Sequence, residues 1–336
     1  MARSFKKTGA SPGKAGAIAA AATAAVLTAL WVQHRARKAE RENPPVGRFV
    51  EVDGVRLHYI EKGQGAAVVL LHGNTVYLQD FIGSGLFDRL AENHRVIAFD
   101  RPGFGYSERP RNRVWTAQAQ AVLLKKALAK IDVERPVLVG HSWGTLVALG
   151  MAVDAPSFVR GLVLVSGYYY PTARLDVALT APAAVPLVGD VLRYTVSPLT
   201  GRLLLKRTVK AMFAPAPMPE NFFDVMPREM MLRPIQIRAE AEDAAFMIPA
   251  AAHFRHHYSK FSMPVSIFAG AGDLVVDVEA HSARLHREIS HSTLTVSPGA
   301  GHMVHYTLAD EIVDAIDSMS DHATMARPTP AVAEST

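Results

Sequence analysis

Short apolar runs alternate with longer amphipathic stretches along most of this chain. Runs such as Ala67–Leu71 and Gly161–Val165 are apolar throughout, which is typical of strands buried on both faces of a sheet. The pattern predicts strands at 49–52, 55–60, 67–71, 95–99, 136–139, 161–165, 265–269 and 292–296, and helices at 116–131, 145–154, 278–289 and 303–319. Strands that alternate with helices favour an α/β fold, in which a mostly parallel sheet carries helices on both faces.

One interval breaks this alternation. About a hundred residues separate the sixth apolar run from the seventh, too many for a loop without structure of its own. The interval is rich in proline, methionine and aromatic residues. We therefore expect a mainly helical cap at about 168–260, within a catalytic domain that extends over 48–319. Residues 320–336 are expected to form a flexible tail.

The N-terminal segment has a different pattern. Residues 15–32 contain no charge, and basic residues flank them on both sides. At about 1.5 Å per residue, a helix of this length reaches just across a bilayer core, with Trp31 near one interface. A membrane anchor is the favoured interpretation, and the flanking charges leave its orientation open. A cleaved signal peptide, suggested by Ala22-Thr23-Ala24, and a soluble alanine-rich helix are the alternatives. The charged and proline-bearing stretch 35–47 is predicted to be a linker.

Charge and cysteine content narrow the possible functions. The formal net charge is +5, but the basic residues are spread out and show no clustering with aromatic residues, so nucleic-acid binding is not expected. The chain has no cysteine, which excludes disulfides, thiolate catalysis and thiolate metal sites.

The sequence Gly140-His141-Ser142-Trp143-Gly144 is the most informative chemical signal. It is a G-x-S-x-G motif placed directly after a predicted strand and directly before a predicted helix. A tight turn in this context exposes the serine hydroxyl, and the helix N-terminus behind it favours a developing negative charge. We therefore predict Ser142 as a nucleophile.

A serine hydroxyl needs a base, and that base needs a group to orient it. His302 is the predicted base, because it follows the last strand and opens the last predicted helix; His305 is its local rival. Asp273 is the predicted orienting acid, at the end of a glycine-rich turn after the preceding strand. Asp277 is the runner-up, although it is also placed to cap a helix.

Two backbone N–H groups are predicted to stabilise an oxyanion. One belongs to Asn74, in the loop after the strand 67–71, and the other to Trp143, which follows the nucleophile. The alternative role of the Asn74 side chain is to position a leaving group or water. The segment 100–107 is interpreted as a turn that supports the site.

The motifs LHGN, DRPGFGYS, GHSWG, AGAGD and PGAGH, in this order and spacing, resemble the α/β-hydrolase superfamily, close to its esterase and epoxide-hydrolase-like branches. The resemblance covers about residues 48–319. It implies an eight-stranded sheet, a cap inserted after the sixth strand and no cofactor. The order of Ser142, Asp273 and His302 in the chain is that of the superfamily.

The resulting hypothesis is a membrane-anchored serine hydrolase that cleaves a carboxylic ester of an apolar small molecule or lipid. Epoxide hydrolases and haloalkane dehalogenases of the superfamily carry an aspartate at the position of Ser142, which argues against both reactions. Carbon–carbon bond hydrolysis and perhydrolysis use serine and stay open, and an inactive membrane-tethered binding protein is a further alternative. No metal site is expected, because the histidines at 253, 256 and 257 are interpreted as a solvated face of the cap.

Overall fold

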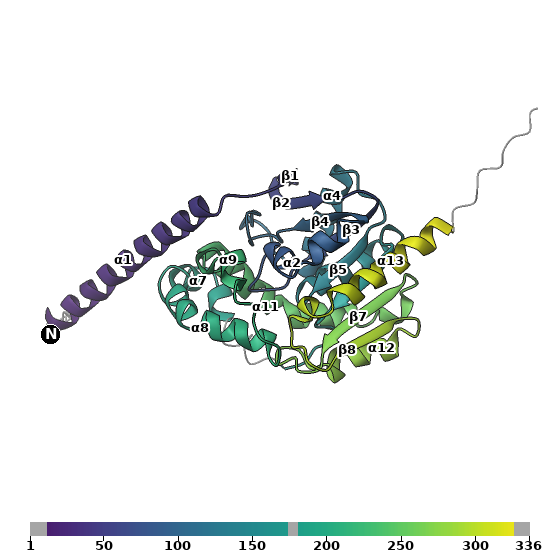
Figure 1. The fold of residues 1–336 in the computed structure, drawn as a ribbon. Coiled ribbons are helices and arrows are strands. Elements are labelled where there is room, and N and C mark those ends of the chain that lie inside the picture. The colour runs from purple at the N-terminus through teal and green to yellow at the C-terminus, as the bar shows by residue number, and fades with distance from the viewer. Residues whose placement is uncertain (1–11, 174–180, 326–336) are drawn as a thin grey trace, which may run out of the picture.

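The computed structural model describes residues 12–173 and 181–325, and its centre is a single eight-stranded sheet (Figure 1). The strand order is β1-β2-β4-β3-β5-β6-β7-β8; β2 is antiparallel to β1 and β4, and all other neighbouring pairs are parallel. The strands are β1 (Arg48–Val52), β2 (Val55–Lys62), β3 (Ala66–Leu71), β4 (His94–Phe99), β5 (Val137–His141), β6 (Gly161–Val165), β7 (Val265–Gly270) and β8 (Thr293–Ser297). The mostly parallel sheet confirms the fold class predicted from the apolar runs.

The turn between β1 and β2 follows the expected chemistry. Asp53 and Gly54 have φ values of 51° and 70°. Two consecutive positive φ angles are those of a type I′ turn, whose twist matches that of the two strands it joins.

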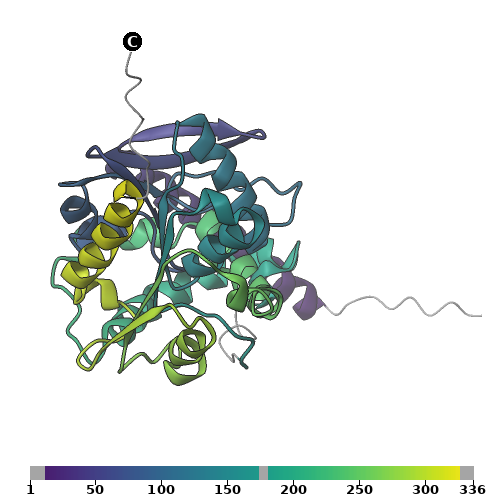
Figure 2. The same cartoon turned by 90° about the vertical axis from the view of Figure 1, so that its right-hand side faces the viewer.

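Helices cover both faces of the sheet (Figures 1 and 2). One face packs against α4 (Ala117–Lys130), α5 (Gly144–Asp154) and α12 (Arg284–Glu288), and the other against α2 (Gln79–Gly83), α3 (Leu86–Leu90) and α13 (Ala309–Met325). The central strands β3, β5, β6 and β7 are largely apolar on both sides because each face is buried beneath one of these layers.

The interval between β6 and β7 forms a mainly helical cap, as the fold class predicts. Its elements are η2 (Ala181–Ala184), α7 (Val188–Leu192), α8 (Val196–Phe213), α9 (Phe222–Val225), α10 (Arg228–Met231), α11 (Pro234–Phe254) and η3 (Tyr258–Lys260). Several methionines and aromatic residues of this interval, among them Met212, Phe213 and Met231, belong to a third apolar cluster. Part of the predicted cap, 174–180, lies outside the described residues.

The N-terminal helix is longer than predicted. α1 (Pro12–Glu42) contains the apolar run 15–32 and continues through the first part of the stretch predicted as a linker. Its last turns dock on the cap: Val32 and Ala39 are buried, and Arg35 donates to Glu229 at 2.9 Å. The linker prediction was therefore wrong for 35–42, because contacts with the cap stabilise a helix that the local charge pattern did not indicate.

The C-terminal part also departs from the predicted boundaries. A 3-10 turn, η5 (Val304–Tyr306), follows His302, and α13 begins only at Ala309, so His302 does not open the last helix. α13 continues to Met325, where a flexible tail was expected, and residues 326–336 lie outside the described part of the chain. The predicted helix 278–289 is divided into a π-helical turn, η4 (Glu279–Ala283), and α12; a further 3-10 turn, η1 (Pro156–Phe158), precedes β6.

Candidate active site

Ser142 lies at the sharp turn between β5 and α5, with φ of 52° in the left-handed region. Such a backbone is costly for a residue with a Cβ and requires support from its surroundings. The Ser142 N–H donates to the carbonyl of Val165 at 2.8 Å, which ties the turn to β6. A Cβ on Gly144 would lie 2.1 Å from the carbonyl oxygen of Leu71, so only glycine lets α5 begin this close to β3.

The structure brings Ser142, His302 and Asp273 together from three loops at the carboxyl edge of the sheet. The Ser142 hydroxyl and His302 Nε2 are 2.8 Å apart, and His302 Nδ1 is 2.8 Å from Asp273 Oδ2. His302 is almost fully buried, which excludes water from the hydrogen bonds on either side of its ring. This arrangement orients the imidazole so that Nε2 can accept a proton from the hydroxyl.

The Asp273 carboxylate is held by three groups, His302 and two backbone N–H donors. Its Oδ1 accepts hydrogen bonds from the backbone N–H groups of Val275 at 2.7 Å and Val276 at 2.9 Å. Burial alone would raise the pKa of Asp273. The nearby His302 and the two N–H donors outweigh burial and hold the pKa below its ordinary value. Asp273 is therefore ionised at neutral pH, the state in which it stabilises a protonated His302.

The two rival residues lie elsewhere. The Asp277 carboxylate accepts a hydrogen bond from the N–H of Ala280 at 2.7 Å, as a helix-capping residue does. His305 Nε2 instead donates a hydrogen bond to the Asp80 carboxylate at 2.9 Å.

Asn74 and Trp143 line the same cavity as Ser142 and His302. The loop of Asn74 approaches the nucleophile closely, since a Cβ on Gly73 would lie 2.9 Å from the Cβ of Ser142. The side chain of Asn74 is turned toward Arg101, whose Nη2 donates to Asn74 Oδ1 at 2.7 Å. This contact leaves the backbone N–H of Asn74 as the predicted oxyanion donor.

Arg101 organises the loop on which Asn74 lies. Its side chain is fully buried, and it donates to the carbonyls of His72 at 2.8 Å and Gly73 at 3.0 Å. Its guanidinium also lies over the Trp143 ring, 4.5 Å from the ring centroid. The segment 100–107 thus contacts both predicted oxyanion residues, as its interpretation as a supporting turn required.

Asp243 is a residue that the sequence interpretation missed. This buried carboxylate on α11 accepts hydrogen bonds from Arg101 at 2.5 Å, from Arg109 at 2.9 Å and from Gln120 at 3.0 Å. It therefore joins the cap to the loops around the nucleophile. The helical spacing could have indicated this residue. Asp243 lies four residues from both Ala239 and Met247, so it shares their buried face of the helix, where a charge needs partners.

A cavity of about 590 Å³ opens over Ser142 between the sheet and the cap. Its walls are mainly apolar and include Tyr168, Met212, Met247, Leu274 and Val276. A cavity of this size, with few polar groups around the reactive hydroxyl, suits a small apolar substrate.

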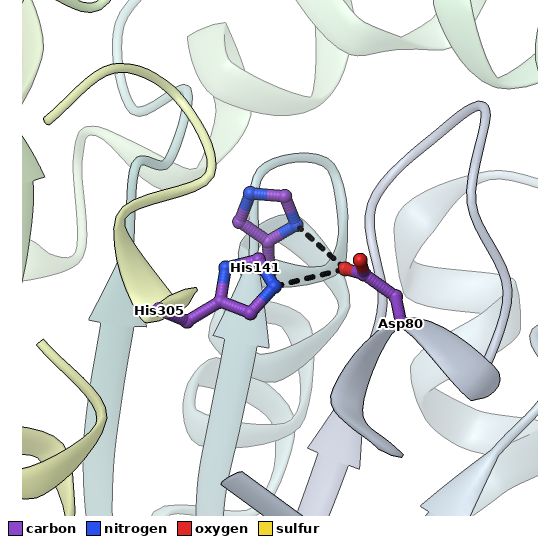
Figure 3. Close-up of side chains that lie close together, drawn as sticks. All are labelled: Asp80, His141 and His305. Atoms are coloured by element: carbon purple, nitrogen blue, oxygen red, sulfur yellow. Dashed lines mark hydrogen bonds and ion pairs between the residues drawn. The ribbon is translucent and has the colours of Figure 1, made fainter. Parts of the chain in front are cut away.

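A second buried polar cluster lies beneath the nucleophile turn (Figure 3). Asp80, His141 and His305 place one ligand atom each within 4.8 Å of one another, and they form the one such group among the described residues that has the spacing of a metal site. Hydrogen bonds account for much of this arrangement: Asp80 accepts from Tyr306 and contacts His305, both at 2.9 Å, while His141 Nε2 is 3.1 Å from the His302 carbonyl. Burial, with the neighbouring histidines, holds the pKa of His141 well below its ordinary value, so this ring is neutral. The cluster therefore connects the loop of Ser142 to that of His302.

The histidines of the cap do not contribute to this site. His253 and His256 are exposed near the end of α11 and after it, and His257 is partly buried.

Comparison with known proteins places the whole arrangement in a family. A family profile described as alpha/beta hydrolase fold matches residues 66–308, which is most of the chain. The chain belongs to the alpha/beta hydrolase family. Membership of this family makes the chain a hydrolase.

Several characterised members of the alpha/beta hydrolase family are similar to this chain. It is 36% identical over 147 residues to 2-hydroxymuconate semialdehyde hydrolase of Pseudomonas sp. (strain CF600), covering 41% of this chain and 50% of the relative. It is 28% identical over 132 residues to haloalkane dehalogenase 2 of Mycobacterium tuberculosis, covering 39% of this chain and 46% of the relative. The chain thus spans about half the length of these curated relatives.

Solved structures of the alpha/beta hydrolase family confirm the fold. An esterase from Exiguobacterium antarcticum superposes with a TM-score of 0.66 at 21% identity, covering 82% of this chain and all of the esterase. At this identity the likeness concerns the fold alone. The α1 helix is outside the residues that the family profile matches.

One acid beside the site leads to a pH-dependent prediction. Burial raises the pKa of Glu240, on α11, to about 7, against an ordinary value of 4.5. Between these two values the folded protein binds a proton that the unfolded chain releases, so this group stabilises the fold below about pH 4.5 and the contribution is lost as the pH rises toward 7. We expect Glu240→Gln to gain stability relative to the wild type between pH 5 and pH 8.

Chemical unfolding of both proteins in the same detergent at pH 5, 6, 7 and 8 measures this effect. Glu242→Gln, two residues along the same helix, is the control. Parallel pH profiles for the wild type and Glu240→Gln would show that the carboxyl keeps its ordinary pKa.

Proposed function

We propose that this protein is a membrane-anchored serine hydrolase that cleaves a carboxylic ester of an apolar small molecule or lipid. The main support for the proposal is the pair of hydrogen bonds that connects Ser142 to His302 and His302 to Asp273 beside a mainly apolar cavity. The family supplies the class of reaction, and these three side chains supply the nucleophile, the base and the orienting acid.

The proposed reaction has two halves. In the first, the Ser142 oxygen attacks the acyl carbon while His302 Nε2 takes the hydroxyl proton, and the N–H groups of Asn74 and Trp143 receive the oxyanion. The tetrahedral intermediate collapses, His302 returns the proton to the departing alkoxide, and the acyl group stays on Ser142. In the second half, water attacks this ester with His302 again as the base, which releases the acid and restores the serine.

The apolar cavity supports the substrate class. Met212, Met247, Leu274 and Val276 offer hydrophobic contact to an acyl or alcohol chain, and their burial by a substrate would favour apolar over charged esters. Carbon–carbon bond hydrolysis or perhydrolysis on the same three residues is the alternative, since both begin from a serine with the same base.

The anchor is supported by α1. Its segment Lys14–Glu42 has a mean hydropathy of 1.9 in its most apolar 18-residue window, and only 6% of that window is buried against the rest of the molecule. An exposed apolar helix of this length is costly in water and stable in a bilayer. A cleaved signal sequence near the N-terminus has the same composition, and the mass of the mature protein in the cell separates the two.

Ester hydrolysis tests the proposed reaction. The full chain in detergent is offered p-nitrophenyl esters of two to sixteen carbons and, separately, a fluorophosphonate probe. We expect labelling of Ser142 and a rate that rises from acetate to longer acyl groups, because each added methylene can contact the mainly apolar walls of the cavity. Labelling without turnover of any ester would support the carbon–carbon alternative instead, and neither labelling nor turnover would support the inactive binding protein.

A further inference from the structure

The outer surface of the cap is unusually apolar. Among the described residues, eight of the twenty exposed large hydrophobic side chains lie within 185–204, on α7, α8 and the turn that precedes α7. Leu187 and Leu203 are 80% and 82% exposed. These eight residues, which we call the cap face, are Val185, Leu187, Val188, Val191, Val196, Leu199, Leu203 and Leu204. Soluble proteins rarely expose apolar residues in such density without a partner for them.

The helix α8 combines this apolar surface with positive charge. Its N-terminal half presents Leu199 and Leu203, and the exposed basic residues that follow are Lys206, Arg207 and Lys210. The helix contains four basic residues and no acidic one. A helix with exposed leucines beside lysine and arginine has the composition of helices that lie in the surface of an anionic bilayer.

The proposed membrane anchor, α1, contacts the cap next to α8. Trp31, at the end of the apolar run, packs against Arg202 of α8, with 4.5 Å between the guanidinium carbon and the ring centroid. Arg35 and Arg202 both pair with Glu229 of α10, so α1 and α8 are joined through one carboxylate. In Figure 1 the N-terminal part of α1 leaves the domain on the side formed by α7, α8 and α9.

The C-terminal end of α1 is also fixed to the domain. Glu40 pairs with Arg233 at 2.9 Å, and the Tyr106 hydroxyl donates to the carbonyl of Asn43. The helix therefore leaves the domain in a defined direction. Trp31 is expected at the membrane–water interface. Arg202, which Trp31 contacts, should therefore lie at the same depth.

We propose that the cap face and the basic residues of α8 rest on the surface of an anionic bilayer, and that the substrate is an ester dissolved in that bilayer. The cavity connects the two parts of this proposal, because α8 also supplies Thr208 and Met212 to its wall, and Leu274, which is 75% exposed, lines it as well. A lipophilic ester then reaches Ser142 along the inner side of a helix whose outer side contacts lipid. This inference rests on the proposed anchor and on the proposed hydrolysis.

Site-specific labelling tests the docking. The chain has no cysteine, so single cysteines can be introduced in the full-length protein and labelled with an environment-sensitive fluorophore. The three variants are Leu203→Cys on the cap face, Leu27→Cys in the exposed apolar part of α1, and Val122→Cys, an exposed position on α4 as the matched control. Each labelled protein is reconstituted in vesicles of phosphatidylcholine with phosphatidylglycerol, with and without lipids that carry a quencher at a known depth.

We expect the label at 203 to shift to shorter wavelength and to be quenched from a shallow depth, the label at 27 from a greater depth, and the label at 122 not at all. A label at 203 that behaves like the one at 122, while 27 is quenched, would overturn the docking and leave the anchor intact. A label at 27 without quenching would overturn the anchor and, with it, this inference. A shift at 203 in detergent without vesicles, accompanied by a dimeric mass, would assign the cap face to a second copy of the chain.

The substrate class has a separate test. The double variant Lys206→Glu and Lys210→Glu places negative charge on α8 against the anionic headgroups. We expect it to hydrolyse a long-chain ester embedded in the vesicles roughly tenfold more slowly, while the rate on water-soluble p-nitrophenyl acetate is unchanged. Equal losses on both substrates would mean that α8 acts on the chemistry and not on access from the bilayer. Unchanged rates on both would overturn the route through the membrane surface.

Discussion

Replacing Ser142 with alanine is expected to lower kcat for ester hydrolysis by roughly a thousandfold or more, with little change in the fold. The alanine removes the only atom that becomes bonded to the acyl group in the proposed reaction, while the cavity and the surrounding N–H groups remain. Loss of a nucleophile of this type leaves only the rate enhancement that binding and oxyanion contacts supply. Initial rates on the ester that the wild type prefers, at saturating substrate, measure the effect.

Ser157→Ala is the matched control, since Ser157 is exposed on η1, away from the cavity. The circular dichroism spectrum of Ser142→Ala should equal that of the wild type. Its unfolding midpoint should be equal or higher, because the variant creates no cavity of note and removes one polar group. A kcat within tenfold of the wild type would show that another residue is the nucleophile.

Asp243→Ala is expected to destabilise the folded protein by about 3–5 kcal/mol. The substitution leaves two buried guanidinium groups, those of Arg101 and Arg109, without the carboxylate that both contact. Removing one partner of a buried ion pair is costly because the remaining charge stays desolvated. Denaturant unfolding in detergent, followed by the signal of the buried tryptophans, measures the change.

The conservative variant Asp243→Asn keeps an oxygen for one of these contacts and should lose less stability. Asp224→Ala, at an exposed acid on α9 of the same cap, should stay within about 0.5 kcal/mol of the wild type. An Asp243→Ala protein as stable as this control would mean that water solvates the two arginines or that a nearby carboxylate pairs with them.

The sheet and the three central side chains were accessible from the sequence because local signals determine both. The strands β3, β5, β6 and β7 are largely apolar runs of β-forming residues, and the G-x-S-x-G turn has a backbone requirement that only a few residue patterns meet. Asp273 and His302 could be selected because glycine-rich turns follow β7 and β8 at the same edge of the sheet. Their distances to one another and to Ser142 depend on how the strands stack, which no single segment encodes.

Long-range contacts explain the features that the sequence did not indicate. The charged end of α1 has the composition of a linker, and it is helical where Arg35 and Glu40 find partners on the cap about two hundred residues away. Asp243 and Arg101 are 142 residues apart in the chain, so neither could be paired with the other from spacing alone. The short helices α2 and α3 have too few residues to show a periodic pattern.

The shared carboxylate of Asp243 limits how this enzyme can be re-engineered. The cap is one continuous insertion between β6 and β7, which makes it a natural unit to exchange for the corresponding segment of another hydrolase. Such a transplant would remove Asp243 from α11 and leave Arg101 without its partner beneath the loop of Gly73 and Asn74. A chimera must therefore supply an acid at this position, or replace Arg101 as well. Selectivity and turnover in this chain have to be redesigned together.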